Sequence, residues 1–265
     1  LALSGTTSRP QVELSARASS LVIDQTELGS ILVEATLGDA GLVVDLDAAL
    51  SVAKLELDLE LPIRLDLARP KLSWDHEAEQ VVALALRDLD IDRLERTLGP
   101  KLPALAELLA AAELGGRVSA SVSGRGRIGD PWLSASLDVD ELSHRGDRLG
   151  DLRVELDHHG ELANATLSLE GSLARRLDAR VELPLHLALT AKQPWVAPRI
   201  AVDPRARVHA EVHVHRVDLG SLQPHVGALP IAGVADLDVL VRGSLADPKL
   251  ELEARIAKLQ IQAER

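Results

Sequence analysis

Apolar and polar residues alternate along much of this chain. In residues 54–67, KLELDLELPIRLDL, every odd position from Leu55 to Leu67 is apolar and most even neighbours are charged. Successive side chains of a β-strand point to opposite faces, so this alternation predicts strands with one apolar and one polar face. Pro62 cannot donate a ladder hydrogen bond, and we expect it to bend or divide the strand. The same pattern returns at residues 165–170, 179–189, 208–214, 235–241 and 249–259.

One segment has helical spacing instead. In residues 90–114, five leucines recur every three or four positions, and Asp90 or Asp92 can cap the first turn. Two prolines interrupt the segment, so the pattern predicts two short helices, closed by Gly115-Gly116. Residues 218–226 are predicted to form a shorter counterpart.

Several landmarks recur at long, similar intervals. Three glycine–proline pairs have the same spacing: Gly5 and Pro10, Gly126 and Pro131, and Gly243 and Pro248. Other landmarks follow the first two pairs at matching distances, namely Leu28-Gly29 and Leu149-Gly150, Leu61-Pro62 and Leu183-Pro184, and Trp74 and Trp195. Unrelated hairpins with common glycine and proline turns are the alternative. We favour a long β repeat, with units at 1–115 and 116–232 and the start of a third at 233–265. The first unit ends in the broken helical segment.

The composition restricts what can fill a core. Phe, Tyr, Met and Cys are absent, and three tryptophans are the only aromatic residues. A compact β-sandwich of this length normally uses large rings, so Leu, Val, Ile and Ala must serve here. The absence of Cys excludes disulfides and thiol chemistry. The missing Met and the start at Leu1 suggest an internal fragment of a longer protein.

Charge narrows the possible partners. The net charge of −12 and the scarcity of aromatic residues argue against nucleic acid, which requires clustered cations and stacking rings. No uncharged run is long enough to span a membrane, and no signal peptide is visible. We therefore expect any membrane contact to be made through segments outside this fragment.

Candidates for catalysis or metal binding are few. His209, His213 and His215 share one face of a predicted strand, where such neighbours can reach one metal ion. Valine and alanine fill the other face, so a solvated polar face is favoured over a metal site. His158 and His159 precede a turn-like glycine and are expected at the surface. No nucleophile elbow, P-loop or dinucleotide-binding turn is present. We therefore predict no catalytic residues, no cofactor and no enzymatic activity.

A sheet with one apolar face must hide that face. The apolar side chains either fill a closed core or, if the sheet curls, line an open groove that acyl chains can enter. Each buried methylene contributes about 0.8 kcal/mol, so a lipid can be held without a specific polar contact. The predicted lining residues are Leu55, Leu57, Leu59, Leu61, Leu167, Leu169, Leu183, Leu185, Leu187, Val212, Val214, Val239, Val241, Leu250 and Leu252.

The phrase GSLADPKL at residues 243–250, which follows GVADLDVLVR, favours the groove. It resembles the recurring strand–turn–strand phrase of the TamB/AsmA-like bacterial envelope proteins. The resemblance implies an all-β fold, an elongated antiparallel sheet built from repeats and curled into a U-shaped, β-taco-like trough. It also implies an inner-membrane-anchored protein of the periplasm that carries phospholipid to the outer membrane of a diderm bacterium. The alternative function is a structural or assembly module, whose strand edges pair with an outer-membrane barrel protein.

Overall fold

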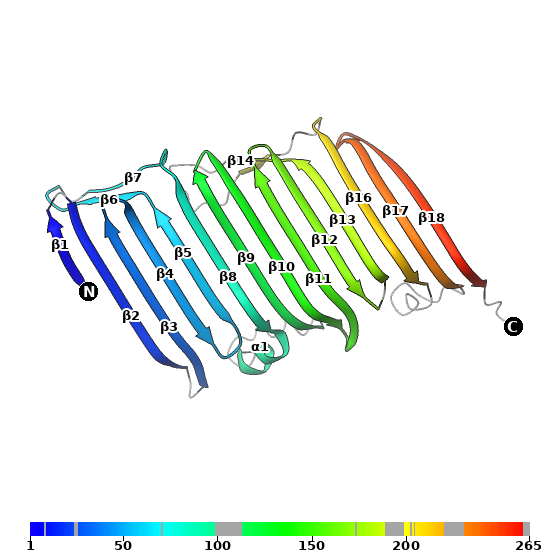
Figure 1. The fold of residues 1–265 in the computed structure, drawn as a ribbon, viewed down its shortest axis with the longest axis horizontal. Coiled ribbons are helices and arrows are strands. Elements are labelled where there is room, and N and C mark those ends of the chain that lie inside the picture. Colours follow the sequence, from blue (N-terminus) through cyan, green and yellow to red (C-terminus); the bar gives the residue numbers. More distant parts are fainter. Residues whose placement is uncertain are drawn as a thin grey trace.

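Most of the chain forms one antiparallel sheet. The structure is a computed structural model that describes residues 1–7, 9–23, 26–69, 71–98, 113–172, 174–188, 199–201, 203, 205–219 and 231–261. Its 14-stranded sheet is open, since neither terminal strand pairs with the other (Figure 1). In spatial order the strands are β1 (Ala2–Thr6), β2 (Arg9–Ile23), β3 (Thr26–Gly38), β4 (Gly41–Leu50), β5 (Lys54–Leu61), β8 (Gln80–Asp90), β9 (Leu114–Arg127), β10 (Asp130–His144), β11 (Asp147–His159), β12 (Leu162–Gly171), β13 (Ala174–Pro184), β16 (Arg207–Asp218), β17 (Ile231–Ser244) and β18 (Asp247–Ile261). The prediction of an all-β, antiparallel fold is confirmed.

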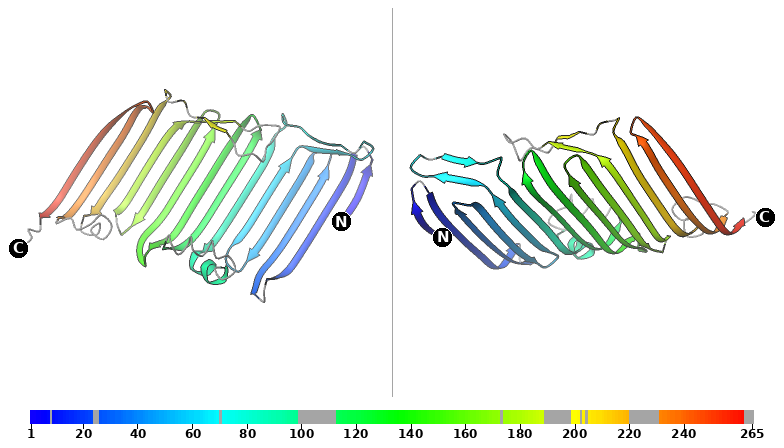
Figure 2. Two further views of the ribbon diagram at one scale, coloured as in Figure 1. Left: turned by 180° about the vertical axis from the view of Figure 1, so that it is seen from behind. Right: turned by 45° about the horizontal axis from the view of Figure 1, so that its top comes forward.

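Two short hairpins leave this sheet on the same side. Strands β6 (Ile63–Asp66) and β7 (Lys71–Trp74) follow β5, and β14 (His186–Ala188) and β15 (Arg199–Ala201) follow β13. Both pairs lie along the upper edge of the sheet in Figures 1 and 2. Strand β6 runs back across β4, β3 and β2, and β14 contacts β10. Pro62 separates β5 from β6, so the expected division of this strand is confirmed.

The three glycine–proline pairs occupy equivalent hairpins. In each, the glycine pairs directly with the proline across the turn: Gly5 with Pro10, Gly126 with Pro131, and Gly243 with Pro248. The order of strands and hairpins from β1 to β8 is repeated from β9 to β16, and β17 and β18 begin the order again. The predicted unit limits at residues 115/116 and 232/233 fall inside β9 and β17.

β-bulges recur at matching places and bend the strands. In β2–β3 the register shifts where Leu21 meets Gly29, and in β10–β11 it shifts where Leu142 meets Gly150. These two glycines have φ of 131° and 135°, a backbone conformation that favours glycine. The repeated leucine–glycine landmark in the sequence therefore marks a repeated bulge.

A second pair of bulges lies in β8–β9 and β16–β17. The extra residues, Asp88 and Arg216, have φ of 55° and 53°. The Asp88 N–H donates to Ser119 Oγ at 3.1 Å, and the Arg216 N–H donates to Asp236 Oδ1 at 2.8 Å. Each bulge thus satisfies its free N–H group with a side chain of the next strand.

The helical segment follows the prediction only in part. Helix α1 (Ile91–Leu98) begins as expected, with Asp90 Oδ1 accepting a hydrogen bond from the Arg93 N–H at 2.8 Å. Residues 99–112, where the second helix was predicted, lie outside the described part. Gly115-Gly116 do not close a helix, because both lie in β9. Gly116 instead sits where a Cβ would come within 2.8 Å of the Asp140 carbonyl oxygen.

The shorter helical counterpart predicted at residues 218–226 is not visible in the described part. Asp218 is the last residue of β16, and residues 220–230 lie outside the described ranges. The start of the predicted helix is therefore wrong by at least one residue, because the sheet pairing of β16 with β17 continues to Asp218.

Candidate functional site: the apolar face of the sheet

The most extended feature of the molecule is a row of apolar residues across the sheet. Directly paired residues point to the same face, so strand pairing defines the row. It runs from β2 to β18 without a polar side chain: Ala16, Val33, Leu46, Leu57, Leu84, Val122, Ala135, Leu156, Ala165, Val181, Ala210, Val241 and Leu250. With neighbouring strands about 4.8 Å apart, the row is on the order of 55–60 Å long.

Nearly all the predicted lining residues belong to this face. Leu57 and Val241 are in the row itself, and flanking rows pair Leu59 with Val82, Val212 with Val239, and Val239 with Leu252. By the same pairings, the face also holds Leu55, Leu61, Leu167, Leu169, Leu183, Val214 and Leu250.

Two predicted residues lie elsewhere. Leu185 stands between β13 and β14, where its N–H donates to the Glu161 carbonyl at 2.9 Å. Leu187 belongs to the small sheet and pairs with Ile200. The alternation that led through residues 179–189 is interrupted at Pro184, where the chain leaves the large sheet.

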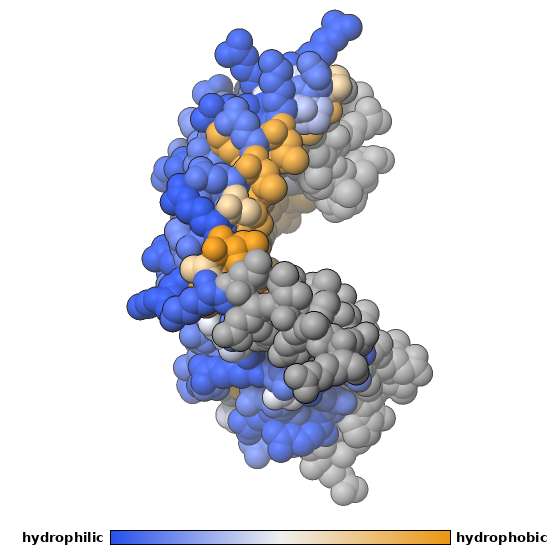
Figure 3. Space-filling model, turned by 90° about the vertical axis from the view of Figure 1, so that its right-hand side faces the viewer, coloured by the Kyte–Doolittle hydropathy of each residue, from blue (hydrophilic) through white to orange (hydrophobic). Residues whose placement is uncertain are grey.

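The apolar face is not a filled core. No side chain of the described residues is both large and fully buried, and the buried apolar residues are mostly alanine and valine. By contrast, Val122 is 51% exposed, Leu156 42% and Leu250 66%. Figure 3 shows hydrophobic residues along the hollowed side of the sheet and hydrophilic residues on the outer side. Among the described residues, the face is thus a long apolar surface with several large side chains left partly exposed.

Packing is tighter around helix α1 at the lower edge. Ile91 of the helix is 9% exposed, and Val52 and Ala53 in the β4–β5 turn are 8% and 6% exposed. The Asp90 N–H donates to the Val52 carbonyl at 3.2 Å. Among the described residues, helix α1 therefore packs against the lower edge of the sheet, and its contacts are with β8 and β9.

His158 is a polar residue on this apolar face, where it pairs with Leu133 and Ala163. It is 2% exposed, so the expectation that it lies at the surface is wrong. Its Nε2 lies 3.0 Å from the Leu185 carbonyl oxygen, and Nδ1 is buried without a hydrogen-bond partner. The segment entering β14 covers the histidine, a contact between distant parts that local spacing could not reveal.

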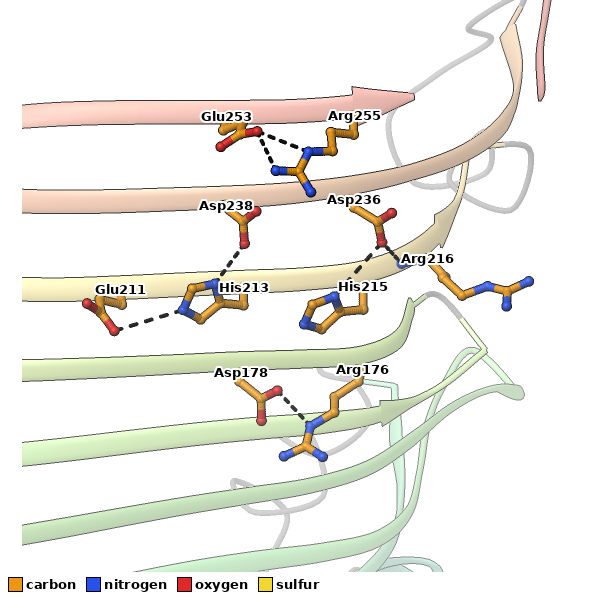
Figure 4. Close-up of polar contacts among 10 residues, drawn as sticks. All are labelled: Arg176, Asp178, Glu211, His213, His215, Arg216, Asp236, Asp238, Glu253 and Arg255. Atoms are coloured by element: carbon orange, nitrogen blue, oxygen red, sulfur yellow. Dashed lines mark hydrogen bonds and ion pairs between the residues drawn. The ribbon is translucent and has the colours of Figure 1, made fainter. Parts of the chain in front are cut away.

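His213 and His215 lie on the polar face (Figure 4), and strand pairing with Glu182 and Arg242 places His209 on the same face. His213 Nδ1 is 2.7 Å from Asp238 Oδ1, and His213 Nε2 is 3.9 Å from Glu211. His215 Nδ1 lies 3.9 Å from Asp236, and His209 Nε2 lies 2.9 Å from Glu211. The hydrogen bond to Asp238 raises the pKa of His213, and the same bond lowers the pKa of Asp238.

Strand pairing determines which of these groups meet. His213 lies directly between Asp178 and Asp238, one on each neighbouring strand. Asp178 also accepts a hydrogen bond from Arg176 Nε at 2.6 Å. Within the described ranges, no group of three or more His, Asp or Glu side chains is arranged to hold a metal ion. Alternating cations and carboxylates make this face a solvated surface.

Comparison with known proteins finds no match: no family model, no curated protein and no solved structure is similar to this chain. Among the described residues, no helix combines the length and apolar character needed to cross a membrane.

Proposed function

We propose that this chain is the lipid-conducting part of a periplasmic protein that carries phospholipid between the inner and outer membranes of a diderm bacterium. In this proposal the curved sheet is a U-shaped trough, and acyl chains lie against its apolar face. The observation that best supports this proposal is the continuous apolar row from β2 to β18. Several of its side chains in the middle of the sheet remain exposed. The cellular setting rests on the resemblance of residues 233–250 to TamB/AsmA-like proteins.

The chemistry of the face suits a mobile lipid. Leu, Val and Ala offer burial of about 0.8 kcal/mol per methylene but no hydrogen bond that would stop a chain at one position. A lipid displaced by one strand spacing meets the same type of surface, so its free energy changes little along the row. Water remains available on the open side for a polar head group. No catalytic group is needed for this function.

A second candidate is assembly through the edge of the sheet. Strand β18 is 15 residues long, and among the described residues it pairs with β17 alone. Its apolar face exposes Leu250, Leu252 and Ile256 by 66%, 63% and 54%. Such an edge can pair with a strand of another protein, including a barrel protein of the outer membrane.

The introduction of a charge at either of two neighbouring residues of one strand tests the conduit. Leu167 lies on the apolar face between Val154 and Ala179, whereas Ser168 lies on the polar face between Arg153 and Asp178. Leu167→Asp places a carboxylate in the path of acyl chains, where desolvation is costly. We expect this variant to lose phospholipid retained in native mass spectrometry and photocrosslinks to an acyl-labelled phospholipid. Ser168→Asp is the matched control and should retain both.

Thermal melting of the same variants separates an open trough from a closed core. In an open trough the new carboxylate reaches water, and Leu167→Asp should melt close to the parent. In a closed core an unpaired buried carboxylate should cost several kcal/mol. A parent protein with no lipid crosslink, together with a collapsed melting temperature for Leu167→Asp, would remove the conduit proposal.

A further inference from the structure

Strand β18 forms one free edge of the large sheet. It is 15 residues long, and among the described residues it pairs with β17 on one side and with no strand on the other. The strand at the opposite edge, β1, has only five residues. A long edge strand offers many free backbone N–H and carbonyl groups to another strand, whereas a short one offers few. Strand β18 is therefore the edge better suited to take a further strand.

The burial of equivalent residues differs between β18 and an interior strand. Strands β10 and β18 follow equivalent hairpins, and Val139 and Ile256 each lie eight residues after the hairpin proline. Val139 pairs with Leu152 of β11 and is 6% exposed, whereas Ile256 is 54% exposed. A strand placed beside β18 would cover this isoleucine.

The backbone of β18 has the same bulge that in β10 contacts the next strand. Glu141 in β10 and Lys258 in β18 each lie ten residues after the hairpin proline and have φ of 56° and 55°. The Glu141 N–H donates to Asp151 Oδ1 of β11 at 2.9 Å. By equivalence, the Lys258 N–H points to the outer side of β18, where no described strand supplies an acceptor. Because the bulge also occurs in the interior strand β10, it does more than protect an edge.

The residue after the bulge sets the register of the next strand. A leucine stands eleven residues after each hairpin proline, at Leu21, Leu142 and Leu259. The first two leucines pair with Gly29 and Gly150 of the next strand, and a serine or an aspartate follows each glycine. A strand beside β18 is therefore expected to place a glycine opposite the third leucine. The serine or aspartate after this glycine accepts the hydrogen bond of the bulge N–H.

The polar residues of β18 define the charges of such a strand. Glu253 lies directly opposite Asp238 of β17, which has the same charge, and forms an ion pair with Arg255 of its own strand at 2.6 Å (Figure 4). Glu251 lies opposite Leu240 and has no charge across from it. Basic residues opposite the two glutamates and an acidic residue opposite the arginine would form three cross-strand pairs. In the register set by the glycine, the acidic residue is the third after it, and the basic residues are the fifth and seventh.

A second copy of this chain does not meet these requirements with the strands at its free edges. Strands β2 and β18 contain no glycine, and β1 ends at Thr6, directly after Gly5. Strand β11 has the glycine and the aspartate, but it is already paired on both sides. Its third, fifth and seventh residues after the glycine, Arg153, Glu155 and Asp157, would also place like charges opposite those of β18.

We propose that β18 binds an antiparallel strand of a different polypeptide in the register that β11 has beside β10. A glycine of the partner lies opposite Leu259, an aspartate or serine follows it, and one acidic and two basic residues complement the charges of β18. The alternate residues are apolar and cover the exposed apolar side chains of the edge. The inference rests on edge assembly, the second function proposed above, and adds to it the register and chemistry of the partner strand.

Two peptides of identical composition test this register on the whole 265-residue chain. Both are based on residues 147–159 of β11, which supply the glycine and the aspartate. The probe carries Arg153→Glu, Glu155→Lys and Asp157→Lys and complements all three charges of β18. The control carries Arg153→Lys and Asp157→Lys and places like charges opposite two of the three. Fluorescence anisotropy at low salt should show the probe binding at least about tenfold more tightly than the control.

One change in the protein and one in the probe examine the two parts of the proposal separately. Arg255 is 71% exposed, so Arg255→Glu should fold as the parent does. This variant opposes one like charge to each peptide and should therefore bind probe and control equally. In the probe, Gly150→Ala should weaken binding about tenfold, because the φ of 135° that this glycine has in β11 disfavours a side chain.

Photocrosslinking locates the bound peptide. A probe with photo-leucine at position 152 should label residues 247–261. Labelling of β1 or β2 instead, equal binding of probe and control to the parent, or an unchanged preference in Arg255→Glu would overturn the inference. A chain that dimerises through β18 and excludes the probe would also overturn it, because a second copy would then occupy the edge.

The outcomes separate this inference from the functions on which the article has drawn. Equal binding of both peptides at β18 would refute the register and leave edge assembly standing. Binding of no peptide would refute both. Neither result bears on the conduit, which the lipid crosslinks of Leu167→Asp decide.

Discussion

The sets of strands β1–β8 and β9–β16 have the same order of elements but differ at individual side chains. Both contain a glycine–proline hairpin, a leucine–glycine bulge and a short hairpin that leaves the sheet. They differ where His158 replaces Leu37 on the apolar face, and where His213 replaces Ala85 on the polar face. Backbone geometry is thus shared, while these two histidines occur in the second set alone.

The shared bulge glycines should give the largest effects, and similar ones in both sets. A Cβ at Gly29 would lie 2.0 Å from the Ala49 carbonyl oxygen, and a Cβ at Gly150 would lie 2.0 Å from that of Glu170. We expect Gly29→Ala and Gly150→Ala each to lower the free energy of unfolding by at least about 3 kcal/mol. Denaturant unfolding measures this.

Gly38→Ala is the control for the bulge glycines, because a Cβ at Gly38 meets no atom within 4 Å. Its stability should change by less than about 0.5 kcal/mol. A strong effect in one set and none in the other would show that the two bulges are not equivalent.

His158→Leu tests the difference between His158 and Leu37, because it introduces leucine, the residue that the first set has at the equivalent position. The change removes the unpartnered Nδ1 but also the 3.0 Å contact with the Leu185 carbonyl. These effects oppose each other, so the free energy of unfolding should change by less than about 1 kcal/mol. Hydrogen exchange should nevertheless become faster in residues 185–188, which lose one of their contacts with the large sheet. A loss of several kcal/mol, or unchanged exchange, would contradict this account.

The smallest effect concerns His213. Its hydrogen bond with Asp238 raises the histidine pKa above 6.5 and lowers the aspartate pKa below 3.8. The histidine contribution to stability is complete below pH 6.5 and is lost as pH rises through its raised pKa. The aspartate contribution is present above pH 3.8 and is lost as pH falls through its lowered pKa. Between pH 3.8 and pH 6.5 both contributions are present, so the melting temperature should hardly change in this interval. Because both groups are solvated, the loss outside it should also be small.

An NMR titration measures the His213 pKa directly. Asp238→Asn should lower it, because the charged hydrogen-bond partner is removed. The partner on the other side, Asp178, is already paired with Arg176 and should have less influence. A His213 pKa that is the same in Asp238→Asn and in the parent would show that the pair does not form in solution.

The sequence alone determined the class of fold and most of the apolar face. Period-two alternation predicts which side chains share a face of the sheet. The repeated glycine–proline spacing predicts which hairpins are equivalent. Both properties are local, so Leu57, Leu167 and Val239 could be assigned to one face before the strands were paired. The N-cap is also local, and Asp90 is one of the two caps that the sequence predicted.

Only the tertiary structure decided what lies above that face. Alternation does not state where a chain leaves a sheet, so Leu185 and Leu187 were assigned to the face although β14 belongs to a separate small sheet. The burial of His158 depends on Leu185, 27 residues away in the sequence.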